Sequence, residues 1–147
     1  YAEYVGAFFS NNPSEIVRCI MNISLCYITL NKTEDAVNLI DGCIDFVNNQ
    51  NEMDNTYLAS LYAIKSSAVK FTNMNEALSQ LDKALDILCA DKNYNLILST
   101  MIEKGFIQHE YGQMKEALNI FHRCLEICKT AGFDNYNNAE YMKVLNR

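Results

Sequence analysis

The feature that most constrains the fold is an internal repeat with a period of about 40 residues. Two polar or charged residues followed by an alanine and an aliphatic residue occur three times, with the alanines at Ala36, Ala77 and Ala117. Four, eight and ten residues after each alanine comes a large apolar residue, and seven residues after it comes a small one. Because these offsets share one face of an α-helix, the same amphipathic helix is predicted three times in register.

A second helix is predicted ahead of each alanine, so that each unit is a helix pair. Apolar residues recur at two offsets before the three alanines. Sixteen residues before them are Ile20, Leu61 and Met101, and nineteen residues before them are Val17, Leu58 and Leu98. Asn- and Gly-containing turns separate the helices, and Gly112 is expected to end one of them in a left-handed conformation. The expected helices are 14–30, 33–49, 54–71, 74–89, 94–111 and 114–130, with a short last helix at 136–146 and the tail of an earlier helix at 1–11.

One helix pair cannot bury its apolar face, so the units must stack on each other. Small residues at the repeated alanine positions let the helices approach closely. The chain has only one proline and five glycines, which favours long helices over a turn-rich sheet. We therefore predict a single all-α domain over 1–147, a right-handed α-solenoid with units at 14–50, 54–90 and 94–131 and the helix at 136–146 as its C-terminal cap.

The third unit resembles a known repeat. A glycine in the first helix, a glycine at the turn, and Ala, an aromatic and a small residue in the second helix are found as Gly105, Gly112, Ala117, Phe121 and Cys124. This pattern resembles the tetratricopeptide repeat. The first two units keep only its second half, because Ser24 and Lys65 replace the first glycine, the tryptophan-like anchor is aliphatic and the closing proline is absent.

Lengthened, degenerate units with a terminal capping helix resemble the sensor domains of bacterial peptide-pheromone regulators, the group typified by the Rap, Rgg, NprR, PlcR and PrgX proteins. Residues 84–89 and 95–105 are the part most similar to PlcR, and the general repeat resemblance covers 14–147. The resemblance implies a groove that binds a short peptide, asparagines on the inner helices that hold the peptide backbone, and dimerisation through the repeat domain. It also implies a DNA-binding helix-turn-helix domain ahead of Tyr1, which would make this chain the C-terminal part of a longer protein.

In such a stack the first helix of each unit lines the concave wall. Placing the units in register predicts a peptide-binding groove formed by Arg18, Met21, Asn22, Leu25, Tyr62, Ser66, Ser99, Glu103 and Phe106, with Ala59, Ala63 and Ile102 beside them. Apolar pockets with a few polar groups suit an extended peptide, whose side chains fill pockets while its backbone needs hydrogen-bond partners.

Five of these residues also have a purely structural interpretation. Asn22 can donate to and accept from a peptide backbone, or it can be an ordinary solvated helix residue. Arg18 can bind a peptide carboxylate, or it can pair with Glu15 on the surface. Tyr62 and Phe106 are either groove anchors or core residues, and aromatic residues at helical spacing are more often core. Glu103 selects a basic peptide or is simply a solvated charge.

The sequence predicts no catalytic or metal site and no cofactor. The repeat register explains Cys43 and Cys124 as small core residues, and Cys26 falls where a helix contact requires a small side chain. His122, Cys124 and Cys128 are close in sequence, but residues two apart on a helix point in different directions and cannot converge on one zinc ion. A catalytic cysteine would need a neighbouring base and a third group that orients the base, and no such sequence pattern surrounds any of the cysteines.

Charge and hydropathy limit the partners. A net charge of −6 leaves no basic patch for phosphates, so DNA contact would come only through the missing N-terminal domain. No run of about 18 apolar residues predicts a membrane span, and the start lacks the basic region of a signal peptide, so a cytoplasmic location is expected.

Two functions are weighed. The first is the sensor domain of a transcriptional regulator, in which a signalling peptide changes the curvature of the stack or its dimer contacts. The second is a scaffold or adaptor that docks a partner segment without switching. Residues 135–147 either cap the last repeat or pair with a second copy in a homodimer.

Overall fold

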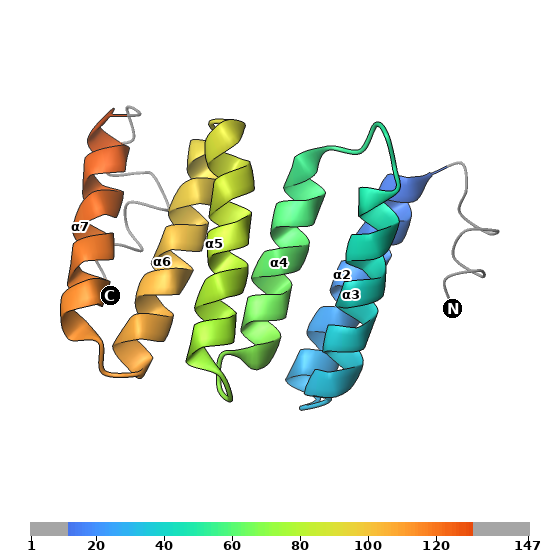
Figure 1. The fold of residues 1–147 in the computed structure, drawn as a ribbon, viewed down its shortest axis with the longest axis horizontal. Helices are drawn as coiled ribbons and strands as arrows, with labels where there is room; N and C mark the ends of the chain where they lie inside the picture. Colours follow the sequence, from blue (N-terminus) through green and yellow to red (C-terminus); the bar gives the residue numbers. More distant parts are fainter. Residues whose placement is uncertain (1–11, 131–147) are drawn as a thin grey trace.

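The computed structural model describes residues 12–130, and within that range the chain is all-helical, with six α-helices and no strand. The helices are α2 (Pro13–Thr29), α3 (Thr33–Asn48), α4 (Asn55–Val69), α5 (Met74–Ala90), α6 (Tyr94–Glu110) and α7 (Met114–Thr130) (Figure 1). The predicted all-α class is therefore confirmed, and each of the six predicted helices ends within two residues of its expected bounds. The predicted helix at 136–146 and the segment 1–11 lie outside the described residues.

Side-chain caps explain where several helices begin. Asn73 accepts a hydrogen bond from the Glu76 backbone N–H at 3.0 Å and opens α5. Asp54 accepts from the Thr56 N–H at 2.9 Å and opens α4. These acceptors satisfy N–H groups that the first turn of a helix leaves without an intrahelical partner.

Left-handed residues explain where other helices end. Gly112 has φ +80° after α6, as predicted, and Asn31 after α2 and Lys92 after α5 have φ values of 60° and 53°. Beyond Gly112, the backbone N–H of Gln113 donates to the Gln108 carbonyl at 2.8 Å, which closes the last turn of α6. The two non-glycine residues adopt the same conformation at greater steric cost.

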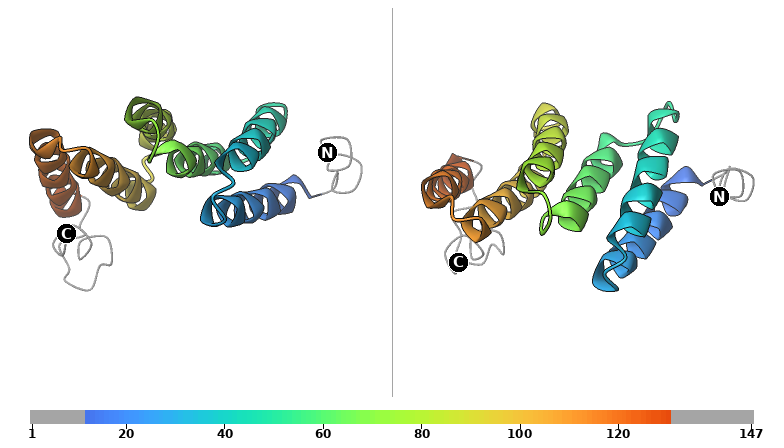
Figure 2. Two further views of the ribbon diagram at one scale, coloured as in Figure 1. Left: turned by 90° about the horizontal axis from the view of Figure 1, so that it is seen from below. Right: turned by 60° about the horizontal axis from the view of Figure 1, so that its bottom comes forward.

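Helices α3 to α7 follow one another across Figure 1 in chain order, with α2 behind α3, and each helix runs antiparallel to the next. All consecutive helices pack together, and α2 also contacts α4. Figure 2 shows α3 and α5 on one side of the row and α2 and α6 on the other. Among these four helices, the two that come first in their predicted units lie opposite the two that come second.

The core follows the repeat register. Ala36, Ala77 and Ala117 are all buried, and so are the apolar residues predicted from the first helices, apart from Leu58, which is half-buried. One core cluster joins α2, α3 and α4, and a second joins α4, α5, α6 and α7. Because α4 contributes to both clusters, it connects the first and second halves of the row.

Gly105 marks a close contact between α6 and α7. A Cβ at this position would lie 2.6 Å from Cε1 and 2.7 Å from Cζ of Phe121. The ring of Phe121 therefore occupies the space that a side chain at residue 105 would need. The units with Ser24 and Lys65 at this position have the aliphatic residues Ile40 and Leu81 in place of the phenylalanine.

Two ion pairs join neighbouring helices at the surface. Lys65 Nζ lies 2.7 Å from Asp41 Oδ1, between α4 and α3, and Lys104 Nζ lies 2.7 Å from Asp82 Oδ1, between α6 and α5. Such partly exposed pairs contribute about 0 to 1 kcal/mol each to stability. Apolar packing is therefore the main source of stability.

The cysteines follow the register only in part. Cys43 and Cys124 are buried as predicted, and burial raises the pKa of the Cys43 thiol to about 12. The prediction for Cys26 is wrong, since this residue is exposed, because its side of α2 is not covered by a neighbouring helix in the described range. Cys128, for which the register gave no explanation, is buried in the second core cluster.

Candidate functional site

Two clefts lie along the boundary between α4 and α6, the first helices of the second and third units. The larger has a volume of about 800 Å³ and lies at the C-terminal ends of both helices. Its lining residues come from α6, from the turns after α4 and α6, and from α7: Lys70, Phe71, Glu103, Phe106, Ile107, His109, Glu110, Tyr111 and Phe121.

The smaller cleft, of about 160 Å³, continues along the same two helices toward the start of α6. Its walls come from α4 and α6 and its floor from α5, through Ala59, Ser60, Ala63, Leu81, Leu88, Leu96, Ser99, Thr100 and Glu103. Glu103 lines both clefts. We therefore treat them as one surface, the α4–α6 groove, defined by these two sets of residues.

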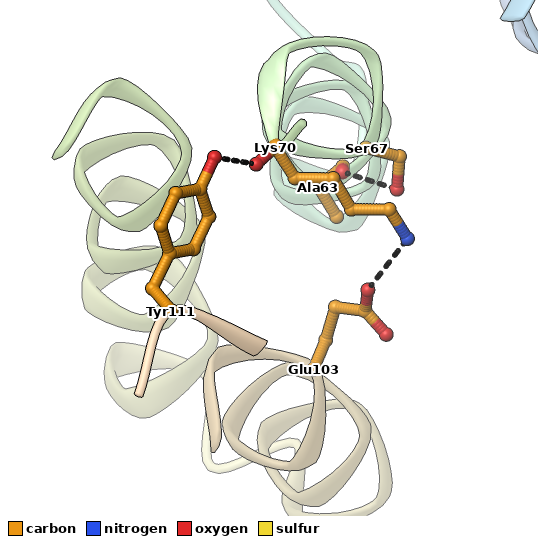
Figure 3. A network of polar contacts seen from close by, with 5 residues as sticks. All are labelled: Ala63, Ser67, Lys70, Glu103 and Tyr111. Atoms are coloured by element: carbon orange, nitrogen blue, oxygen red, sulfur yellow. Dashed lines mark hydrogen bonds and ion pairs between the residues drawn. The ribbon is translucent and has the colours of Figure 1, made fainter. Parts of the chain in front are cut away.

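Polar contacts cross the groove at one end. Lys70 Nζ lies 3.4 Å from Glu103 Oε1, and the Tyr111 hydroxyl donates a hydrogen bond to the Lys70 carbonyl (Figure 3). On the α4 side, the Ser67 hydroxyl donates to the Ala63 carbonyl at 3.3 Å. The Tyr111 and Glu103 contacts join the end of α6 to the end of α4, whereas the Ser67 bond lies within α4.

Aromatic side chains form much of the larger cleft. The rings of Phe106 and Phe121 are 5.5 Å apart between centroids and tilted by 56°. Phe71 is 81% exposed, and Lys70 Nζ lies 5.2 Å from the centroid of its ring. Phe71 adjoins other aromatic side chains in the lining of the cleft, and contiguous exposed apolar patches often mark interaction sites.

Three of the predicted site residues are brought together in this groove. Glu103 and Phe106 line the larger cleft, and Ser99 lines the smaller one with Glu103. Ala59 and Ala63, which were expected beside them, also line the smaller cleft. Phe106 packs against the second core cluster as well, so the same ring lines the cleft and contributes to the core.

The four predicted residues of α2 line neither cleft. Arg18, Asn22 and Leu25 are exposed, and Met21 is partly buried against the first core cluster. Arg18 pairs with Glu15 at 2.9 Å, which is the structural alternative considered for it. The structure therefore places these residues on a separate part of the surface.

Two of the predicted residues of α4 face the interior. Ser66 is fully buried, and its hydroxyl has no hydrogen-bond partner within residues 12–130. Tyr62 is half-buried and packs against both main core clusters, and Lys83 Nζ lies 5.6 Å from its ring centroid. Ile102 is also buried.

Sequence reasoning missed the residues at the ends of the first helices. Leu30, Phe71 and Tyr111 each lie six residues before the alanine of their unit, and all three are exposed. The repeat therefore places a large apolar or aromatic residue at the same exposed point in every unit. Two of them, Phe71 and Tyr111, line the larger cleft. Comparing the exposed positions of the three units, as well as the buried ones, would have identified them from the sequence.

Other kinds of site have no comparable support in the described part of the chain. Between residues 12 and 130, no group of three or more His, Cys, Asp or Glu side chains could hold a metal ion. None of the described helices combines the length and apolarity that crossing a bilayer requires.

Comparison with known proteins adds no family to these observations. No protein-family model matches the chain, and no curated protein matches it either. Interpretation of its function therefore depends on the α4–α6 groove.

Proposed function

We propose that this chain is a peptide-binding module, built as a right-handed α-solenoid of tetratricopeptide-like helix pairs that holds a short extended segment in the α4–α6 groove. The observation that carries the proposal is the position of the two clefts beside each other, sharing Glu103, with aromatic side chains and a few polar groups in their linings. Extended peptides bind to surfaces of this kind, because their side chains fill apolar pockets and their ends or charges fix the register.

The length of the groove sets the size of the ligand. Leu96 and Tyr111 are fifteen residues apart along α6, which at about 1.5 Å per residue is about 22 Å. An extended chain spans at most about 3.3–3.6 Å per residue, so the groove accommodates roughly six residues. Ser99 donates its hydroxyl hydrogen to the Asn95 carbonyl at 3.2 Å, which leaves its oxygen able to accept from a ligand N–H.

A regulatory role follows naturally if peptide binding is coupled to a second domain. The two walls of the groove belong to different units, and an occupant that separates or draws together α4 and α6 would change the angle between these units. The fuller proposal is the sensor of a cytoplasmic transcriptional regulator, dimeric and coupled to an upstream DNA-binding domain, and a change of angle between these units is the observation that would bear on its switching. An adaptor without switching uses the same groove and differs only in lacking a change of shape.

The binding proposal is tested by selecting a displayed library of random dodecapeptides against the immobilised full chain. Enriched peptides are resynthesised and their affinities measured by calorimetry for the wild type and for Phe71→Ser, in the groove. Leu118→Ser is the matched control, because Leu118 is also a large exposed apolar residue, at 57%, but lies on α7 and lines neither cleft.

We expect Phe71→Ser to weaken binding by about tenfold and Leu118→Ser to leave it unchanged, since burial of an aromatic side chain contributes on the order of 1.5 kcal/mol or more. Failure to enrich any peptide, or equal effects of the two substitutions, would refute a binding role for the groove. For the sensor proposal, the distance between spin labels on α2 and α7 should change when an enriched peptide is added. An unchanged distance would favour the adaptor.

A further inference from the structure

Lys70 occupies a distinctive place in the α4–α6 groove, between a carboxylate and an aromatic ring. We propose that its ammonium group stands where a basic side chain of the ligand binds, so that the groove takes a peptide with Arg or Lys next to apolar residues. This inference rests on the proposed peptide-binding function and specifies the chemistry of its ligand.

The charges of the larger cleft favour a cation. Glu103 and Glu110 supply two carboxylates, and among residues 12–130 Lys70 is the only lysine or arginine that lines this cleft. The whole chain has a net charge of −6, which further attracts cationic ligands over a range of about one Debye length. A ligand cation that displaces the Lys70 ammonium group therefore meets both carboxylates, and no other lysine or arginine of the described lining competes with it.

The aromatic residues add a second attraction for the same kind of group. Phe71, Phe106, Tyr111 and Phe121 all line the cleft. The Lys70 ammonium lies 5.2 Å from the Phe71 ring centroid, within the distance at which a cation is attracted to the negative face of an aromatic ring. An arginine from a ligand could use such a face and a carboxylate together, because its guanidinium is planar and carries five donors.

The Lys70 side chain is held loosely. Its 3.4 Å distance to Glu103 is the longest of the four ion pairs among residues 12–130, whereas the Lys65 and Lys104 pairs measure 2.7 Å. Both side chains of the pair are about one-third exposed, so the pair contributes little stability. Exchange of one cation for another at Glu103 therefore carries a small energetic penalty.

The backbone of Lys70 is held independently of its side chain. The Tyr111 hydroxyl donates to the Lys70 carbonyl and joins the ends of the two helices (Figure 3). The ammonium group can thus swing away from Glu103 while the rim of the groove keeps its shape. An acidic peptide would instead meet Glu103 and Glu110, and a wholly apolar one would leave the Lys70–Glu103 pair in place.

The test uses the dodecapeptides enriched on the wild-type chain. Each is resynthesised with its basic residue replaced by glutamine, and both forms are titrated by calorimetry into wild type, Lys70→Met and Glu103→Gln. Lys104→Met is the matched control, because it removes the same charge from α6, where Lys104 pairs with Asp82 and lines neither cleft.

We expect the enriched peptides to share an Arg or Lys beside an aromatic or aliphatic residue. Lys70→Met should bind them about threefold more tightly and Lys104→Met with unchanged affinity, since only the first substitution removes a competitor for Glu103. Glu103→Gln should weaken binding about fivefold and remove the difference between the basic and glutamine forms of each peptide.

The inference is overturned if groove-dependent peptides are enriched without a basic residue, or if Glu103→Gln leaves the preference for the basic form intact. Those results would leave peptide binding by the groove standing. If no peptide is enriched at all, the proposed function itself fails, and the inference fails with it.

Discussion

The contact between Gly105 and Phe121 gives a quantitative test of how α6 and α7 pack. An alanine at residue 105 would place its Cβ 2.6 Å from Phe121 Cε1, which is closer than carbon atoms approach in folded proteins. Alanine in a helix is favoured over glycine by about 1 kcal/mol, whereas overpacking a core contact costs about 1–3 kcal/mol. Gly105→Ala is therefore expected to reduce the free energy of unfolding by up to about 2 kcal/mol.

The same substitution should have the opposite effect once the ring is removed. Phe121→Leu introduces the residue that the second unit has at this position, Leu81. In that background the alanine meets no ring, so Gly105→Ala should stabilise the protein by up to about 1 kcal/mol. The expected coupling energy between the two substitutions is about 1–3 kcal/mol.

Urea unfolding of the wild type, both single variants and the double variant measures this coupling. Gly42→Ala serves as the control, since a Cβ at Gly42 meets no atom within 4 Å and should stabilise α3 by about 0.5–1 kcal/mol. Effects of Gly105→Ala and Phe121→Leu that add within about 0.5 kcal/mol would refute the proposed contact.

Three further predictions concern stability. Gly112→Ala should destabilise the protein by about 1–2 kcal/mol in thermal unfolding, because φ +80° is unfavourable for a residue with a Cβ; an unchanged Tm would contradict this cap. Ser66→Ala removes a buried hydroxyl that has no hydrogen-bond partner in the described residues, whereas Ser24→Ala breaks a 2.8 Å hydrogen bond to the Ile20 carbonyl. In urea unfolding, the free energy of unfolding of Ser66→Ala should therefore exceed that of Ser24→Ala by about 1 kcal/mol. Burial raises the pKa of the Cys43 thiol from 9.0 to about 12, so the unfolded thiol loses its proton first and stability falls as pH rises through this window. Between pH 8.5 and 10 the wild type should lose about 1 kcal/mol more than Cys43→Ala, and equal losses would show that the thiol ionises alike in both states.

The positions of the helices were predictable because they depend on local signals. Apolar residues at helical spacing and a glycine after α6 act within a few residues along the chain. The burial of Ala36, Ala77 and Ala117 was predictable too, because three copies of one pattern are stronger than any single helix.

The location of the groove was only partly predictable, because it depends on how far apart two helices of different units lie. Periodicity places both Ser66 and Ser99 on the first helices of their units. Packing buries Ser66, however, whereas Ser99 lines the smaller cleft. Similarly, Lys70 and Phe71 lie where α4 ends, and their proximity to Glu103 follows from the approach of α6. No local pattern encodes that approach.

The claim that the α4–α6 groove is the binding surface is tested most directly by photo-crosslinking. An enriched dodecapeptide carrying a benzophenone side chain is irradiated with the full chain, and the attached residues are identified by mass spectrometry. We predict attachment to groove residues, principally Phe71, Phe106 and Tyr111. Attachment to the exposed surface of α2, at Asn22 or Leu25, would contradict the account and place the peptide on a different part of the molecule.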